Sequence, residues 1–251
     1  MSMQKALPSG GAFCFCVTPA TVLTAMPFDP QQLPILPPPD TLPAVPRERL
    51  QADWLRQRFA APPLWQPEVL VEAPLPASRT THTPAAVLIP LVLHDDHITV
   101  LLTQRTAHLH DHAGQISFPG GRVEASDSSP QHTALRETAE EIGLESQQIE
   151  LLGTLPDYHT GSGFRVTPVV GLVTPPLVLQ LDAFEVAETF EVPLHFLTDP
   201  QFHQQREIDF PPLGKRVFYA MPYRDPVLQH EYFIWGATAG MLRNLYRFLL
   251  A

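Results

Sequence analysis

The chain is poor in cysteine and lysine, and it has no long uninterrupted hydrophobic run. Its two cysteines, Cys14 and Cys16, are too close together for an ordinary disulfide and too few for a zinc site. The two lysines, Lys5 and Lys215, leave arginine to supply most of the positive charge. No apolar stretch reaches the roughly 18 residues that a membrane-spanning helix needs. These shortages indicate a protein of a reducing compartment that does not span a membrane.

The formal net charge is −10 at pH 7. This argues against nucleic acid as a partner, because nucleic-acid binding needs a positive surface that displaces phosphate counterions. An acidic protein that handles an anionic substrate must use a local arginine pocket, a metal ion or both. Residues 12–26 come nearest to a signal-peptide core, but threonine and proline interrupt them, so we expect a cytoplasmic protein. Translation from Met26 is an alternative explanation of this stretch.

Proline is concentrated near the start of the chain, at positions 27, 30, 34, 37, 38, 39, 43 and 46. Proline removes backbone donors and favours extended conformations over packed helix or sheet. We therefore expect residues 1–47 to be a disordered extension that is dispensable for folding and catalysis. Residues 48–83 are expected to form a short helix and an extended linker. The globular domain is then expected at residues 84–251.

Within that domain, apolar runs and periodicity alternate between strand and helix. The 44% of apolar residues can build a core. The expected fold class is α/β of the α+β type, with a mixed β-sheet between helices. Strands are predicted at 85–93, 97–104, 149–155, 164–173 and 186–192, and helices at 47–59, 130–142 and 233–249. Glycine and proline make residues 105–121 a loop with a short strand at most.

The helix predicted at residues 130–142 carries a group of acidic side chains. At 100° per residue, Glu137, Glu140 and Glu141 fall on about one third of the helix circumference, beside Arg136. Like charges at this spacing destabilise a helix by about 0.2–0.5 kcal/mol per pair. A solvated surface face is the ordinary explanation of such a run. A divalent cation is the functional one, and all-oxygen ligands favour Mg²⁺ or Mn²⁺.

The residues before this helix favour the functional explanation. Gly121 is followed after five residues by Asp127, and after eight more by the run RETAEEIGL at residues 136–144. This pattern resembles the signature of the Nudix family. The common signature has glutamate at the Asp127 position, seven residues before the Arg-Glu pair, and an apolar residue at Thr138. The longer spacing here matches the subgroup of coenzyme A (CoA) pyrophosphatases.

The segment upstream adds a second pattern, with LLTQRT at residues 101–106, then Gly114, then FPGG at residues 118–121. It resembles the motif that marks CoA pyrophosphatases among Nudix proteins, which usually have arginine where this chain has His110. Residues 165–171 and 233–240 also resemble this subgroup. The resemblance implies a Nudix-like α/β/α sandwich. It also implies cleavage of CoA or acyl-CoA to 4′-phosphopantetheine, or its acyl form, and adenosine 3′,5′-bisphosphate.

The same resemblance implies roles for individual residues. The three glutamates would bind the metals, with a backbone carbonyl of Gly120 or Gly121 as a further ligand, and Arg136 would orient the glutamates. Candidates for phosphate contacts are Arg105, His110 and Arg122, although surface salt bridges would explain them almost as well. His110 alternates with two other histidines, which we interpret as a loop near the substrate and not as a zinc site. For the general base, Glu188 is preferred over its neighbours Glu185 and Glu191.

Three alternatives remain open at the level of sequence. A Nudix hydrolase could act on ADP-ribose, a dinucleotide or a damaged nucleotide instead. A Nudix domain that has lost catalysis could serve as a binding module, against which the intact glutamates weigh. The proline-rich segment could dock on aromatic-lined grooves of other proteins, together with enzymatic activity. The sequence leaves a homodimer open, and it decides neither the acyl chain nor the choice between Mg²⁺ and Mn²⁺.

Overall fold

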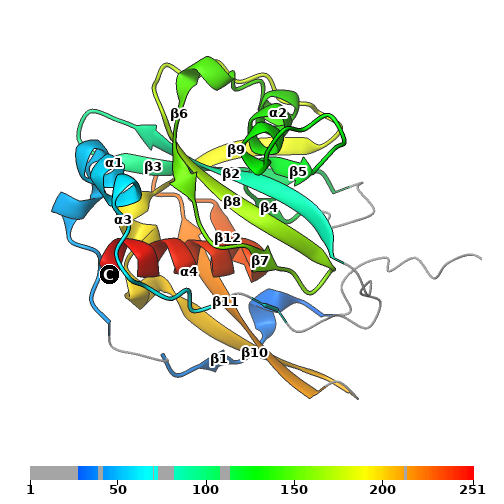
Figure 1. The fold of residues 1–251 in the computed structure, drawn as a ribbon. Helices are drawn as coiled ribbons and strands as arrows, with labels where there is room; N and C mark the ends of the chain where they lie inside the picture. Colours follow the sequence, from blue (N-terminus) through cyan, green and yellow to red (C-terminus); the bar gives the residue numbers. More distant parts are fainter. Residues whose placement is uncertain (1–27, 39–41, 70, 73–81, 108–113, 212–213) are drawn as a thin grey trace, which may run out of the picture.

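The computed structural model describes residues 28–38, 42–69, 71–72, 82–107, 114–211 and 214–251 (Figure 1). Four α-helices lie in these residues: α1 Ala52–Ala60, α2 Pro130–Ile142, α3 Leu194–Leu197 and α4 Gly236–Leu250. The strands are β1 Ile35–Leu36, β2 Thr83–Leu93, β3 Ile98–Arg105, β4 Ile116–Ser117, β5 Gly120–Arg122, β6 Ile149–Thr154, β7 Tyr158–His159, β8 Phe164–Val173, β9 Val186–Pro193, β10 Gln204–Phe210, β11 Gly214–Arg224 and β12 Glu231–Trp235.

A mixed sheet of eight strands forms the centre of the molecule. Its main path is β4-β3-β2-β8-β6, with β5 added to β2, β7 to β8 and β9 to β3. Strands β2 and β8 are parallel from Thr83↔Phe164 to Val92↔Val173, whereas β3, β5 and β6 pair antiparallel to their neighbours. The apolar runs that predicted β2 and β8 are buried on both faces, as expected for strands covered on both sides.

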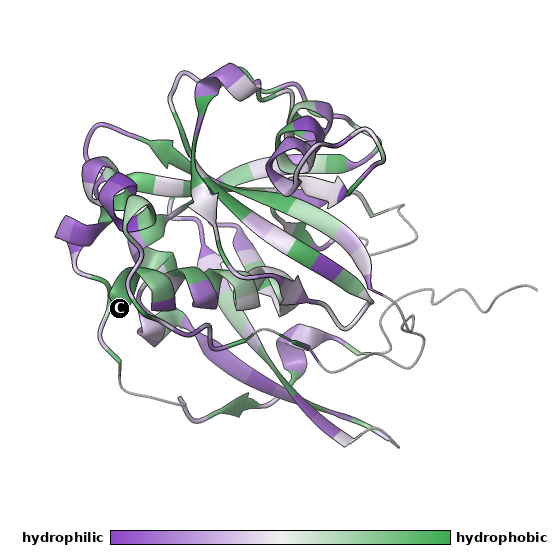
Figure 2. Cartoon of the chain, in the orientation of Figure 1, coloured by the Kyte–Doolittle hydropathy of each residue, from purple (hydrophilic) through white to green (hydrophobic). Residues whose placement is uncertain are grey.

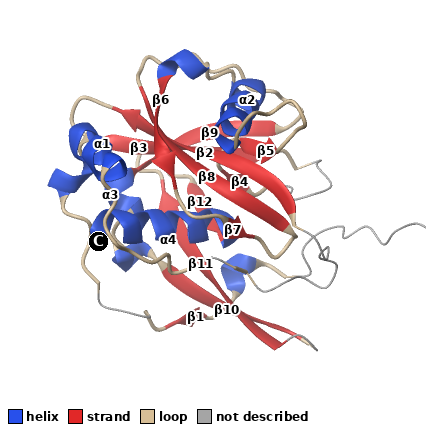
Figure 3. Cartoon of the chain, in the orientation of Figure 1, coloured by secondary structure: helices blue, strands red, loops and turns tan. Residues whose placement is uncertain are grey.

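Helices cover the two faces of this sheet. On one face, Ala134 of α2 packs against Ala86 and Leu88 of β2. On the other face, α4 contributes Leu242, Leu245 and Leu249 to the largest core cluster, together with Ile89 of β2. Figures 1 and 3 show α2 on the far side of the central strands from α4. The predicted mixed sheet between helices is therefore confirmed.

A second sheet was not anticipated from the sequence. It has the order β1-β10-β11-β12, and its strands β11 and β12 pack against α4 (Figure 1). The ring of Tyr232 in β12 also stacks on Phe190 of β9, so this sheet contacts the central sheet as well. The helix predicted to begin at Phe233 was wrong in its first turn, because residues 233–235 pair with β11 as part of β12. Gly236 then adopts φ 62°, a conformation that turns the chain from strand into helix at little steric cost.

Residues 62–72, called the linker here, bind along α4 through buried polar contacts. The Asn244 side chain accepts hydrogen bonds from the backbone N–H groups of Glu68 and Val69, at 2.9 and 3.1 Å. The Glu68 carboxylate pairs with Arg243, which is 1% exposed, and accepts a hydrogen bond from Tyr219 of β11. The linker is therefore part of the fold and joins α4 to the second sheet.

Part of the expected N-terminal extension is ordered in the structure. Val45 is buried, and β1 pairs with β10. Arg206 of β10, which is 7% exposed, donates to the carbonyls of Gln31 and Leu33 at 2.6 and 2.9 Å. Apolar burial and these otherwise unmet donors explain why a proline-rich segment packs here. Residues 1–27 and 39–41 lie outside the described residues, and the division into domains stays a prediction.

Hydrophobic residues gather on the central strands and on α4, while α1 and α2 carry hydrophilic residues (Figure 2). Among the helices that the structure describes, none is long and apolar enough to cross a membrane.

The contacts of residues 28–46 lead to a first prediction. A chain that begins at Arg47 should unfold at a lower temperature than a chain that begins at Phe28. It loses the burial of Val45 and the two hydrogen bonds that Nη1 of Arg206 donates to Gln31 and Leu33. A hydrogen bond from a charged group contributes about 1.5–3 kcal/mol. Each kcal/mol should lower Tm by roughly 2–4 °C in a domain of this size. Calorimetry of both truncated chains checks this. Equal melting temperatures would instead support the sequence-based expectation that the segment is dispensable.

Candidate functional site

Helix α2 begins and ends at residues suited to those positions. Ser129 caps its N-terminus by accepting a hydrogen bond from the His132 N–H at 3.2 Å, and Pro130 occupies the first turn, where no backbone donor is needed. At the other end, the N–H of Gly143 bonds to the carbonyl of Ala139. These boundaries fix which face of the helix the acidic residues occupy.

Arg136 lies at the centre of the acidic group. Its guanidinium bonds both oxygens of Asp127 at 3.0 Å, and Glu137 and Glu140 at 3.0 and 2.9 Å. It also donates to the carbonyl of Arg122 at 3.1 Å. The Asp127 side chain has no exposed surface, and its hydrogen bonds from Arg136 hold its pKa well below the usual range. Arg136 therefore holds the loop before α2 against the helix.

The two glycines of β5 allow the glutamates to pack directly on the backbone. The N–H of Gly120 donates to Glu141 at 3.1 Å. A Cβ atom on Gly121 would lie 2.4 Å from the carboxylate carbon of Glu137, far inside contact distance. Any side chain at position 121 would displace Glu137. Gly121 is thus required by the close approach of α2 to β5, whereas Gly120 is required by the close approach of β5 to Ala86 and Val87 of β2.

Glu137 and Glu141 are carboxylates in an environment that disfavours their charge. Burial raises the pKa of Glu141 to about 7, opposed by the hydrogen bond from Gly120 and the charge of Arg105. Burial also raises the pKa of Glu137, against the opposing effect of Arg136. A cation placed between these carboxylates would offset their desolvation. The all-oxygen donor set fits a hard divalent metal such as Mg²⁺ or Mn²⁺.

The glutamates do not yet converge on one point in this conformation. Among the described residues, no three His, Cys, Asp or Glu side chains stand close enough together to hold a metal ion. Glu140, whose side chain is 59% exposed, is bound to Arg136. Glu140 is therefore the most exposed carboxylate of the three.

Arg105 at the end of β3 lies beside the same carboxylates. Its guanidinium nitrogens are 3.7 Å from Glu141 and 3.9 Å from Glu185. The upstream segment singled out in the sequence thus reaches the glutamates through Arg105. His110 lies outside the described residues. Arg122 is exposed, and its guanidinium stands 5.4 Å from the ring centre of Phe164.

Glu185, just before β9, interacts electrostatically with the glutamates of α2, whereas Glu188 on β9 does not lie beside them. The charge of Glu185 contributes to the raised pKa of both Glu137 and Glu141. Glu188 lies opposite Gln104 and shares its face of β9 with Phe190, in the core on the α4 side of the sheet. Burial and then the charge of Glu188 raise the pKa of Tyr232 on that side. The structure therefore does not bring Glu188 to the glutamates of α2.

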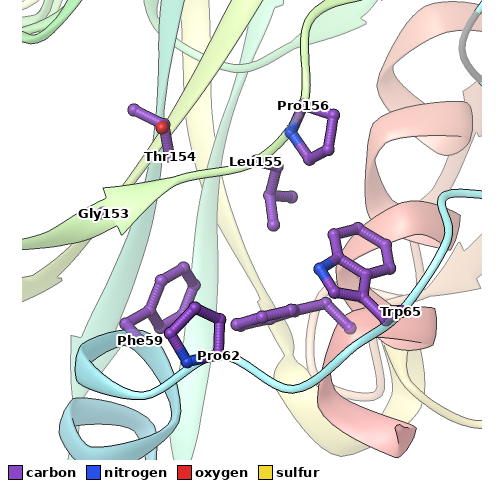
Figure 4. A pocket seen from close by; sticks show the side chains of 8 residues that line it. Phe59, Pro62, Trp65, Gly153, Thr154, Leu155 and Pro156 are labelled. Carbon is purple, nitrogen blue, oxygen red and sulfur yellow. The ribbon is translucent and has the colours of Figure 1, made fainter.

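An apolar pocket of about 300 Å³ lies elsewhere, between α1, β6 and α4 (Figure 4). Its walls include the rings of Phe59, Trp65 and Phe248. No titratable side chain lines it, so it offers no group for acid–base or metal chemistry.

Comparison with known proteins agrees with this geometry. The family model described as the NUDIX domain matches residues 82–208. The chain belongs to the Nudix family. It is similar to the "Uncharacterized Nudix hydrolase NudL" of Enterobacter sp. (strain 638), with 40% identity over 161 residues that cover 64% of this chain and 80% of the relative. The protein of the same name in Escherichia coli (strain K12) is 38% identical over 164 residues, covering 65% of this chain and 81% of its own.

The solved structures to which the chain is similar include an Ap4A hydrolase of C. elegans, with 24% identity and a TM-score of 0.38. This match covers 45% of the present chain and 80% of that structure. As a Nudix hydrolase, the chain is a pyrophosphatase that acts on nucleoside diphosphate-linked compounds. Nudix enzymes bind small nucleotide substrates and generally use divalent cations.

The buried position of Glu141 leads to a second prediction. Glu141→Gln should fold normally, because the neutral amide resembles the protonated form that burial favours. It should weaken Mg²⁺ or Mn²⁺ binding in a calorimetric titration. Turnover should fall by about a hundredfold or more, since even outer partners of a metal site contribute about 10–100-fold. Glu145→Gln, at an exposed residue just beyond α2, is the matched control. Wild-type turnover in Glu141→Gln would exclude Glu141 as a metal ligand.

Proposed function

We propose that this protein hydrolyses the diphosphate of CoA or acyl-CoA. The products would be 4′-phosphopantetheine, or its acyl form, and adenosine 3′,5′-bisphosphate, and the reaction would require Mg²⁺ or Mn²⁺. The observation that carries the proposal is the position of Arg105. This arginine belongs to the upstream segment that resembles CoA pyrophosphatases, and it lies 3.7 Å from the buried carboxylate of Glu141. That segment is therefore in place to take part in substrate binding.

Each of the site residues has a separate role in the proposed reaction. Glu137, Glu140 and Glu141 would hold the cations, which polarise phosphoryl oxygens when bound. Arg136 keeps the glutamates in position through Asp127. Arg105 would contact the diphosphate that is cleaved and stabilise charge as it builds up on the leaving phosphate. No covalent nucleophile is required for this reaction.

Glu185 would act as the general base that takes a proton from the attacking water. We prefer Glu185 to Glu188, the residue favoured from the sequence, for two reasons. Glu185 lies within 4 Å of Arg105, and its charge acts on Glu137 and Glu141. Its side chain is 43% exposed, so it can pass the proton on to solvent. A homodimer and a cytoplasmic location remain predictions from the sequence.

The substrate is tested by a third prediction. Wild-type protein should show a higher kcat/KM on CoA than on ADP-ribose or diadenosine polyphosphates, under identical metal and salt. Arg105→Ala should lower kcat/KM on CoA by about ten- to a hundredfold, because a charge-assisted hydrogen bond contributes about 1.5–3 kcal/mol. Product analysis by mass spectrometry identifies the bond that is cut. A preference of tenfold or more for ADP-ribose would overturn the CoA assignment in favour of the alternative from sequence.

The general base is tested by a fourth prediction. Glu185→Gln should reduce kcat by about 10²–10⁴-fold, the usual contribution of a positioned general base. It should leave KM close to the wild-type value and should remove the acidic limb of the pH–kcat profile. Glu188→Gln, on the opposite face of β9, should have the smaller effect. If Glu188→Gln proves the more damaging variant, the preference drawn from the sequence is restored.

A further inference from the structure

The short strand β5 carries two functional positions on opposite faces of the central sheet. Among the described residues it pairs with the first half of β2, in the register Ala85↔Arg122 to Val87↔Gly120, and no described strand pairs with its other edge, called the open edge here. Successive residues of a strand point to opposite faces. Gly121 faces α2, where Glu137 packs against it. Arg122 therefore directs its side chain around the open edge, toward the α4 face.

On that face, Arg122 meets Phe164 at the start of β8. The two side chains are brought together by β2, because Arg122 pairs with Ala85 and Phe164 pairs with Thr83. The guanidinium carbon lies 5.4 Å from the centre of the phenyl ring. Such a cation–π contact holds a guanidinium without using its N–H donors. Arg122 has no ion pair or hydrogen bond from its side chain to another described residue, so its donors stay available.

The other arginines near the site each lie within 4 Å of a carboxylate, and Arg105 is already assigned to the diphosphate that is cleaved. Arg105 lies between Glu141 and Glu185, and Arg136 is bound to Asp127 and two glutamates. Arg165, the neighbour of Phe164, is 3.6 Å from Asp157. The protein has a net charge of −10. Arg122 is held in place by Phe164 and its N–H donors are free among the described residues, so it is suited to bind an anionic group of a ligand. The backbone carbonyl of Arg122 accepts a hydrogen bond from Arg136, which also binds Glu137 and Glu140. Arg122 is therefore connected to the glutamate cluster through Arg136.

We propose that Arg122, positioned by Phe164, binds a second phosphate of the substrate, a monoester on the same nucleoside as the cleaved diphosphate. This inference rests on the proposed function, because in CoA the 3′-phosphate and the diphosphate are attached to one ribose. A substrate that crosses the open edge of β5 places the diphosphate at the glutamates and the 3′-phosphate at Arg122. Arg105 then binds the diphosphate that is cleaved, and Arg122 selects substrates whose nucleoside carries a 3′-phosphate.

The test compares CoA with dephospho-CoA, which lacks only the 3′-phosphate. Arg122→Ala should lower kcat/KM on CoA by about ten- to a hundredfold, the usual loss of a charge-assisted hydrogen bond, and leave dephospho-CoA unchanged. Phe164→Leu keeps an apolar side chain but removes the ring face. It should raise KM for CoA several-fold with little change in kcat. Arg224→Ala, at an exposed arginine of β11, controls for the loss of one surface charge.

The outcomes separate this inference from the proposed function. If CoA and dephospho-CoA are cleaved equally well, or if Arg122→Ala slows both equally, Arg122 does not read the 3′-phosphate. If neither compound is cleaved, the proposed function is wrong, and the role of Arg122 is then tested by nucleotide binding alone. In that case calorimetry should show tighter binding of adenosine 3′,5′-bisphosphate than of adenosine 5′-monophosphate, and Arg122→Ala should abolish the difference. Equal binding of the two nucleotides would overturn the inference. Thermal melting of each variant identifies any loss of folding.

Discussion

The site depends on the two-oxygen pairing of Arg136 with Asp127. Three glutamates on one turn of a helix repel one another, and Glu141 is also buried and Glu137 partly buried, so the arrangement is unfavourable by itself. Arg136 offsets this by binding Glu137 and Glu140 while Asp127 holds the guanidinium in a fixed plane. The same arginine binds the carbonyl of Arg122, which couples strand β5 to the helix. Helix, loop and strand are thereby positioned by one side chain.

The close contact between α2 and β5 gives this arrangement its precision. Because Gly121 has no side chain, Glu137 rests directly on the strand, and Gly120 can donate its N–H to Glu141. Two carboxylates are thus placed by backbone atoms, which move less than side chains do. The remaining glutamate, Glu140, stays exposed. The group therefore combines two carboxylates placed against the backbone of β5 with one exposed carboxylate that is bound to Arg136.

Sequence reasoning worked where local pattern decides the structure. The apolar runs of β2 and β8 and the helical period of α2 each predicted an element correctly, and the spacing of Asp127 and Arg136 predicted the family. Prediction from sequence failed where pairing between distant segments of the chain determines the structure. Strands β10 and β11 carry polar residues on their outer positions, and the sequence did not predict them. Phe233 was predicted to begin a helix, but it lies in β12 and pairs with β11. The choice between Glu188 and Glu185 as general base stays a prediction, but the sequence did not indicate the irregularity at Gln104 and Arg105, which shifts the register of β9 by one residue. No local signal in the sequence announces such a shift.

The linker has a consequence for how the protein can be divided. The family model ends at residue 208, before β11, β12 and α4. Yet α4 covers one face of the central sheet, and Glu68 of the linker binds Arg243 within that helix. A fragment limited to residues 82–208 would expose the apolar side of β2 to water. The smallest autonomous piece of this enzyme is therefore longer than the part it shares most recognisably with its relatives. A fusion or truncation therefore has to keep Glu68 of the linker and α4 as well as residues 82–208.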